Sequence, residues 1–184
     1  MSVLFTADTH FGHGGALGLF QRPFDTVAAM DEAMVARWNE AVAPRDDVWH
    51  LGDFAVPPAS RATPEHLGAL LDRLHGCKRL VAGNNDGETV RALSGWREVL
   101  DYTEIEVQGV GLVLCHYPFR SWRNDRRGWW NLHGHSHHRL KPQTRQRDVG
   151  VDGHDFRPIT LDVLTRRAAH DVRRAGETEG SRPR

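Results

Sequence analysis

An apolar run passes directly into polar residues near the start of the chain, where residues 2–10 read SVLFTADTH. A run of this length is typical of a short buried strand, and its carboxyl end carries an aspartate and a histidine. Residues 47–53 (DVWHLGD) and 79–86 (RLVAGNND) repeat the order of apolar strand and polar end. Helix-like patterns separate the three runs. This alternation predicts a parallel sheet with right-handed crossovers.

Two amphipathic helices are expected between these strands. Apolar residues at three- and four-residue spacing predict the first over residues 25–43, with Asp25 as its N-cap and Pro44 after its end. Thr63 followed by Pro64 is typical of a helix start, and leucines between residues 67 and 74 then share one face.

The pattern changes after residue 100. Residues 103–107 alternate between polar and apolar, Gln108 and Gly109 form a turn, and residues 110–115 return as an apolar run. These features predict an antiparallel hairpin, so the α/β fold should contain mixed sheets. The remaining expected elements are short strands over residues 131–135 and 148–151, a short helix over 88–93 and a final helix over 159–169.

Composition indicates one ordinary globular domain, since 24 Lys and Arg balance 24 Asp and Glu among 184 residues. We assign this domain to residues 1–172, and residues 173–184 lack apolar side chains and are expected to be a disordered tail. No apolar run approaches the roughly 20 residues that a membrane span needs, and no signal peptide is evident. Cys77 and Cys115 are far apart, which fits a reducing compartment. We therefore expect a cytoplasmic protein without a membrane partner.

Residues able to bind metal recur at the expected strand ends. The candidate ligands are Asp8, His10, Asp53, Asn84, His116, His135 and His137. In open α/β sheets this edge is where ligands bind. A single hydrolytic metal takes about three protein ligands and leaves a position for water, so the set implies two divalent metal ions. Residues two apart in an extended segment point the same way, so Asp8 can converge with His10.

This ordered pattern resembles the calcineurin-like metallophosphoesterase superfamily, whose signature is D-x-H, G-D, G-N-H-[DE], a lone H and G-H-x-H. The resemblance implies a four-layered α/β/β/α sandwich. It also implies hydrolysis of a phosphodiester, or of an activated phosphate ester, by attack of a metal-bridging hydroxide. Under this resemblance one metal is held by Asp8, His10, Asp53 and His137, and the other by Asp53, Asn84, His116 and His135, with Asp53 bridging. The ligands include no thiolate, so manganese is the first expectation and iron or zinc are alternatives.

The sequence departs from the family signature at Asn85, where the family carries histidine. An amide can donate a hydrogen bond but cannot act as a general acid near neutral pH. By resemblance this favours a phosphodiesterase over a phosphomonoesterase. His13, three residues after His10, is a candidate substitute acid or phosphate contact. Asp47, Asp86 and Asp152 are carboxylates available to orient the ligand imidazoles.

Arginines supply the candidate contacts to a phosphate-ester substrate, namely Arg22, Arg120 and Arg123. Residues 119–147 contain eight basic residues against one acid, with three tryptophans interleaved, a pattern that resembles a single-strand nucleic-acid surface. A solvated rim is the simpler interpretation. The alternatives to a phosphodiesterase are a phosphomonoesterase, a single-strand nuclease and a non-catalytic binding module. An amidohydrolase is disfavoured because its His-x-His pair would lie on the first strand. The sequence indicates no oligomeric state.

Overall fold

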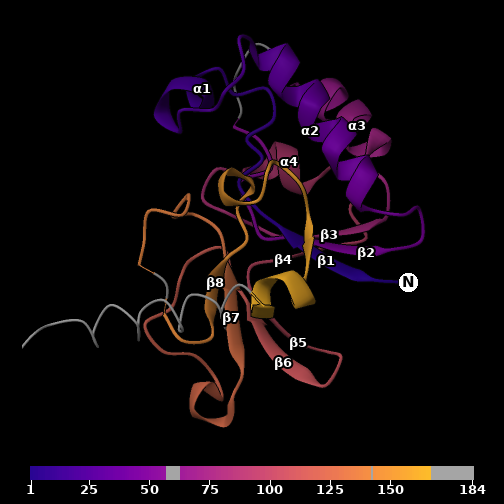
Figure 1. Ribbon diagram of the computed structural model, residues 1–184. Helices are drawn as coiled ribbons and strands as arrows, with labels where there is room; N and C mark the ends of the chain where they lie inside the picture. Colours follow the sequence, from indigo (N-terminus) through magenta and orange to yellow (C-terminus); the bar gives the residue numbers. More distant parts are fainter. Residues whose placement is uncertain (57–62, 142, 167–184) are drawn as a thin grey trace, which may run out of the picture.

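The computed structural model describes residues 1–56, 63–141 and 143–166. Two β-sheets pack face to face, and two helices lie side by side on the outer face of the first sheet (Figure 1). The expected tail over residues 173–184 lies outside the described residues, as does the end of the helix expected over 159–169.

The first sheet has the strand order β4-β3-β2-β1-β9. Its parallel strands are β1 (Val3–Thr6), β2 (Asp47–His50), β3 (Cys77–Val81) and β4 (Glu98–Leu100), and β9 (Ile159–Thr160) is antiparallel to β1. The predicted parallel core is therefore confirmed. The sequence reasoning missed β4, and it placed Ile159 in a helix that begins at residue 161 instead.

The second sheet has the order β5-β6-β7-β8. Its strands are β5 (Thr103–Val107), β6 (Val110–Leu114), β7 (Trp130–His133) and β8 (Gln146–Asp148). The β5–β6 hairpin is antiparallel as predicted, and the other two pairings are parallel. Both sheets are thus mixed, which confirms the predicted fold class. The strand expected over residues 148–151 is only the end of β8, followed by the 3-10 turn η2 (Val151–Gly153).

Two apolar cores follow from the alternation of side chains along the first sheet. Leu4 and Val48 face helices α2 (Val27–Ala41) and α3 (Pro64–Arg73), whereas Phe5 and Trp49 face the second sheet. A strand covered on both faces has no polar side, which explains the continuous apolar runs in the sequence.

Helix boundaries differ slightly from the expectation. The hydroxyl of Thr26, not the carboxylate of Asp25, caps α2 by accepting a hydrogen bond from the Ala29 N–H at 3.1 Å. Thr63 caps α3 in the same way, and Pro64 is the first helical residue as predicted. Two shorter helices, α1 (Gly15–Leu19) and α4 (Glu88–Arg91), follow the ends of β1 and β3. The helix expected over residues 88–93 is therefore confirmed, two residues shorter than expected.

The outer face of the second sheet is covered by an irregular segment, residues 117–129. Its only helical part is the 3-10 turn η1 (Asp125–Arg127). The ring of Trp129 lies against Gly111 of β6, so closely that a Cβ on Gly111 would overlap it. Asn131 of β7 accepts a hydrogen bond from the Phe119 N–H at 3.0 Å. In the described part of the chain, this segment occupies the side where the expectation placed a second layer of helices.

Candidate metal centre

Strand ends bring the predicted ligands to one edge of the sandwich. Asp8 follows β1, Asp53 follows β2 and Asn84 follows β3 in the first sheet. In the second sheet His116 follows β6, and His135 and His137 follow β7. Parallel strands end at the same edge, so residues from distant parts of the chain meet there.

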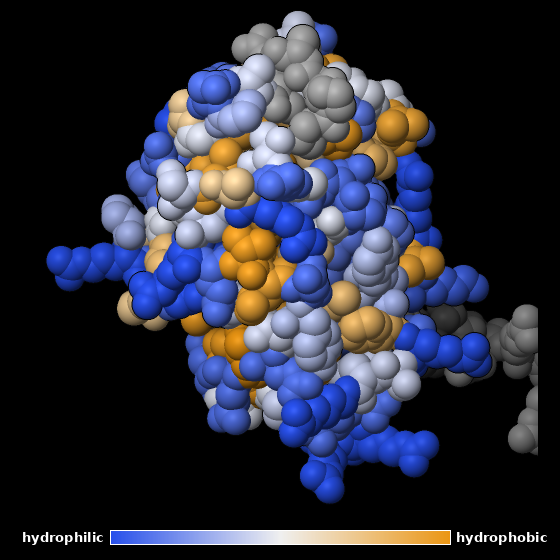
Figure 2. Space-filling model, turned by 180° about the vertical axis from the view of Figure 1, so that it is seen from behind, coloured by the Kyte–Doolittle hydropathy of each residue, from blue (hydrophilic) through white to orange (hydrophobic). Residues whose placement is uncertain are grey.

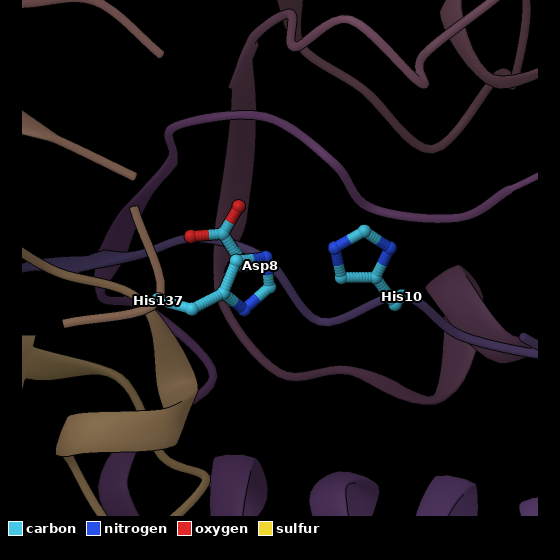
Figure 3. Close-up of side chains that lie close together, drawn as sticks. All are labelled: Asp8, His10 and His137. Carbon is cyan, nitrogen blue, oxygen red and sulfur yellow. The ribbon is translucent and has the colours of Figure 1, made fainter. Parts of the chain in front are cut away.

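Two overlapping groups of ligand atoms form at this edge. Within each group all ligand atoms lie within 4.8 Å of one another, and Asp8 is common to both. The first group comprises Asp8, His10 and His137, and the second group comprises Asp8, Asp53 and His116. Figure 3 shows the first group, in which Asp8 and His10 come from the loop after β1 and His137 comes from the loop after β7.

Asp53 connects the two groups. Its Oδ2 lies 3.7 Å from Nε2 of His10, in the first group, and 3.6 Å from Nε2 of His116, in the second. An oxygen between one imidazole of each group is placed as a shared ligand would be. The residue common to both groups is nevertheless Asp8, so both carboxylates are candidates for a shared ligand.

Asn84 and His135 lie at the exposed margin of the second group. Oδ1 of Asn84 is 3.1 Å from Nε2 of His116. The ring of His135 packs edge-on against that of His116, with centroids 5.1 Å apart, and its backbone N–H donates to Asp8 at 3.1 Å. Both residues thus stand next to the second group, as the resemblance implies.

Buried polar atoms without partners show that the residues fit a cation. Within the described residues, Oδ2 of Asp8 and both ring nitrogens of His10 are buried and accept or donate no hydrogen bond. Folded proteins rarely leave such atoms unpaired, because each costs about 1–3 kcal/mol. Asp and His together are a donor set suited to divalent transition metals.

Electrostatics point the same way. Burial, together with the neighbouring carboxylates of Asp148 and Asp53, raises the pKa of Asp8 well above its usual range. Burial, aided by the charge of Arg22, lowers the pKa of His10 well below its usual range. A divalent cation would favour the ionised carboxylate and the neutral imidazole, which are the forms that bind metal.

Five of the seven predicted ligands adopt a left-handed backbone. Their φ angles are 58° at Asp8, 52° at His10, 57° at Asp53, 65° at His135 and 46° at His137. This conformation disfavours side chains with a Cβ by about 1–3 kcal/mol and concentrates at functional sites. Asp8 and His10 therefore converge through tight turns, not through the extended segment that the sequence suggested.

Glycine before a ligand permits the close approach of loops. A Cβ on Gly134 would lie 2.7 Å from Oδ2 of Asp8, and one on Gly52 would lie 2.7 Å from Nδ1 of His116. Gly52 also has a φ of +90°. These clashes explain why a glycine precedes both Asp53 and His135 in the sequence.

Two of the three available carboxylates support the ligands. Asp86 accepts hydrogen bonds from the N–H groups of Asp53, Phe54 and Gly83 at 2.7–2.9 Å, which ties the ends of β2 and β3 together. Burial raises its pKa to about 6. Asp152 lies 2.7 Å from Nδ1 of His137. Asp47 pairs instead with Arg79 within the first sheet.

Asn85 contacts a ligand directly. Its side-chain amide donates to Oδ2 of Asp53 at 2.6 Å, and its backbone N–H donates to Oδ1 at 2.9 Å. The residue that replaces the family histidine therefore anchors the carboxylate that connects the two groups. The sequence singled out Asn85 but gave no sign of this anchoring role.

His13 and Phe20 border the first group. The His13 ring is half-buried, with its centroid 5.5 Å from that of His10, and burial lowers its pKa. The Phe20 ring stacks on His137 with centroids 3.5 Å apart and an interplanar angle of 13°. Sequence reasoning did not identify Phe20, because only the fold places the loop after β1 against the loop after β7.

The three candidate arginines have different surroundings. Arg22 is buried, and its guanidinium bonds to Asp152 and to backbone carbonyls, so it does not face solvent as a phosphate contact would. Arg123 is exposed and pairs with Glu104 of β5 at 2.9 Å. Arg120 lines a cavity of about 430 Å³ together with Phe119 and Lys141.

Comparison with known proteins agrees with this fold. The family model described as the calcineurin-like phosphoesterase superfamily domain matches residues 1–173, and the chain belongs to that family. An uncharacterized protein of Methanocaldococcus jannaschii is 28% identical over 89% of each chain. The gene 66 protein of Mycobacterium phage D29 is 32% identical over 86% of this chain and 92% of its own.

A solved structure shares the fold. A protein of unknown function from Aquifex aeolicus superposes with a TM-score of 0.70 at 22% identity, covering 89% of this chain and 97% of its own.

None of the helices in the described part of the chain has the length and apolar character that a membrane span requires.

Proposed function

We propose that this protein hydrolyses a phosphodiester with the help of two divalent metal ions. The observation that carries the proposal is the pair of overlapping ligand groups, joined by Asp8 and Asp53 and containing buried atoms without hydrogen-bond partners. Divalent ions at such a centre lower the pKa of a shared water and neutralise phosphate charge. Manganese is our first candidate, with iron or zinc as alternatives.

The chain's own residues hold this centre in two sets. As the family resemblance implies, Asp8, His10, Asp53 and His137 would hold one ion, and Asp53, Asn84, His116 and His135 would hold the other. Two observed groups support these sets, Asp8 with His10 and His137, and Asp8 with Asp53 and His116. The left-handed turns of five of these ligands would help to hold them in place before an ion binds.

Asn85 and His13 are our candidates for contact with the reacting phosphate. The Asn85 amide carries two N–H donors, and Asp53 uses one of them, so the other is available to a phosphate oxygen. An amide cannot protonate a poor leaving group, which favours diesters over alkyl monoesters. His13 borders the first group and would supply a second hydrogen bond.

The cavity beside Arg120 is our candidate subsite for the remainder of the substrate. Pro118 of this cavity is two residues from His116, and Leu140 is three residues from His137. An extended chain spans at most about 3.6 Å per residue, so these walls begin within roughly 11 Å of the metal ligands. Arg120 and Lys141 supply positive charge, and Phe119 an aromatic face.

A single-strand nuclease is a second candidate, favoured by that cavity and by the surrounding basic side chains. Long hydrophilic side chains project from the half of the molecule that holds the second sheet, next to a hydrophobic patch (Figure 2). Cleavage of an oligonucleotide that weakens steeply with added salt would support this candidate, because salt competes with contacts to phosphate. Arg120→Gln should then reduce the salt dependence.

The decisive experiment compares bis(p-nitrophenyl) phosphate with p-nitrophenyl phosphate, first without metal and then with Mn²⁺, Zn²⁺, Fe²⁺ or Mg²⁺. We expect metal-dependent turnover of the diester that is lost in Asp53→Asn. Asp47→Asn is the matched control, because Asp47 lies on β2, the strand that precedes Asp53, but pairs with Arg79.

Each other outcome excludes part of the proposal. A preference for the monoester would identify a phosphomonoesterase. Two bound metals without turnover of any ester would favour a non-catalytic binding module. Failure to bind any divalent metal would overturn the proposal as a whole.

A further inference from the structure

We propose that the buried ion pair between Arg22 and Asp152 positions the first group, and with it one of the two metal ions. This inference rests on the proposed function, because it presumes that the first group holds a divalent ion. It reassigns Arg22 from a contact with substrate to a support for the ligands.

Arg22 holds the turn that carries Asp8 and His10. Its side chain has no exposed surface. Nη1 donates to the backbone carbonyl of Thr9 at 2.7 Å, and Nη2 donates to that of Asp8 at 2.6 Å. These carbonyls belong to the left-handed turn between the two ligands, so the guanidinium stabilises a backbone that is otherwise unfavourable.

Asp152 links Arg22 to His137 through hydrogen bonds to both residues. One carboxylate oxygen accepts from Nε of Arg22 at 2.8 Å, and the other accepts from Nδ1 of His137 at 2.7 Å. A hydrogen bond at Nδ1 places the proton there, which leaves the lone pair of Nε2 for a metal. Arg22 therefore contacts or supports every member of the first group.

A third contact limits rotation of the His137 ring. Phe20 stacks on that ring, and Arg22, two residues along, lies 5.4 Å from the centroid of Phe20. One short segment thus fixes both the turn after β1 and the imidazole after β7. The ring can neither rotate about its bonds nor tilt without losing one of these contacts.

Apart from Asp8, which both groups share, the second group has separate supports. Asp53 is held by Asn85 and by the loop bonded to Asp86, and Nδ1 of His116 donates to the Leu51 carbonyl at 2.8 Å. Breaking the pair between Arg22 and Asp152 should therefore weaken one ion much more than the other. A buried ion pair that acted only on stability would show no such selectivity.

The test measures metal binding without substrate. We expect the metal-stripped wild-type protein to bind two Mn²⁺ ions in calorimetry and to show the electron paramagnetic resonance of a coupled pair. In Asp152→Asn the Kd of one ion should rise about 10- to 100-fold, and the Kd of the other should change much less. The spectrum should then change to that of isolated Mn²⁺.

Two further variants keep the test interpretable. Asp47→Asn removes the partner of another ion pair, 2.7 Å from Arg79 and away from the ligands, and should leave both ions unchanged. If Asp152→Asn does not fold, Arg22→Lys takes its place in the test. This variant retains the positive charge but loses the combined contact with Asp152 and with the backbone carbonyls, and it should weaken the same ion. Circular dichroism of each metal-free variant reports its folding.

Three results would overturn the inference. Unchanged binding of both ions in folded Asp152→Asn would show that the pair does not position the first group. Equal weakening of both ions would show a general loss of structure. No Mn²⁺ binding to the wild type would overturn the proposed function, and this inference with it.

Discussion

Single residues at the candidate centre combine backbone strain with unpaired buried atoms. Asp8 and His10 are left-handed, and each has a buried polar atom that lacks a hydrogen-bond partner within the described residues. Each feature alone opposes folding by about 1–3 kcal/mol. The sequence could predict that these residues follow strand ends, because each comes directly after an apolar run. Their turns and the burial of Arg22 could not be predicted, because both depend on contacts between segments up to 130 residues apart.

Asn85 offers a direct test of leaving-group assistance. Replacing it with histidine would supply a side chain that can act as a general acid, a contribution typically worth 10²- to 10⁴-fold in rate. We expect Asn85→His to raise the turnover of an alkyl phosphate monoester relative to that of p-nitrophenyl phosphate by at least about 10-fold, because p-nitrophenolate leaves without a proton. An unchanged ratio, with both metals still bound, would contradict the role assigned to the amide.

Asn85→Ala completes that comparison. It removes the hydrogen bond to Asp53 without adding an acid. We expect weaker metal binding and lower turnover of both esters, with little change in their ratio. The pair of variants thus separates anchoring of Asp53 from assistance to the leaving group.

Elements were predicted well where periodicity was long. Helix α3 begins at the expected proline, and the strands β1, β2 and β3 follow the apolar runs. Elements of two or three residues were not predicted, because so short a segment shows no periodicity of apolar side chains. Strand β9 has only two residues, and its pairing with β1, not its sequence, makes it a strand. The segment over residues 117–129 likewise gains its place from contacts with the second sheet.

The start of α2 gives a prediction at the scale of an element. Thr26 caps the helix, whereas Asp25 makes no capping hydrogen bond to it. Loss of such a cap typically costs about 1 kcal/mol. We expect Thr26→Ala to lower the free energy of unfolding by that amount in urea titrations, and Asp25→Ala to change it by less than about 0.5 kcal/mol. A larger loss of stability in Asp25→Ala than in Thr26→Ala would show that Asp25 is the N-cap, as the sequence predicted.

The buried side chain of His50 makes the free energy of unfolding depend on pH. His50 lies in the apolar core between Trp38, Phe54 and Trp96, and burial lowers its pKa to about 3. The unfolded chain takes up this proton below its ordinary pKa of about 6.5, whereas the folded protein resists it. The free energy of unfolding therefore decreases as pH falls from about 6.5 towards 3, by up to about 1.4 kcal/mol per pH unit for this one group.

Replacing His50 tests that dependence. We expect metal-free His50→Gln to show a shallower loss of unfolding free energy between pH 6.5 and 4 than the wild type, in urea titrations at each pH. Identical slopes in His50→Gln and wild type would show that other buried groups carry the dependence.

Metal binding should change how the stability of the whole protein depends on pH. Loops from both sheets converge at the ligand edge, so an ion held there joins the two sheets in the folded state alone. An ion at 100 times its Kd adds about 2.7 kcal/mol per site. Burial holds the pKa of Asp8 high, so protons compete with metal there, and the gain from Mn²⁺ should shrink as pH falls from 7 to 5. Thermal unfolding with and without Mn²⁺ measures this gain. Asp53→Asn should show little of it at any pH, and a full gain in that variant would mean that Mn²⁺ stabilises the protein from another site.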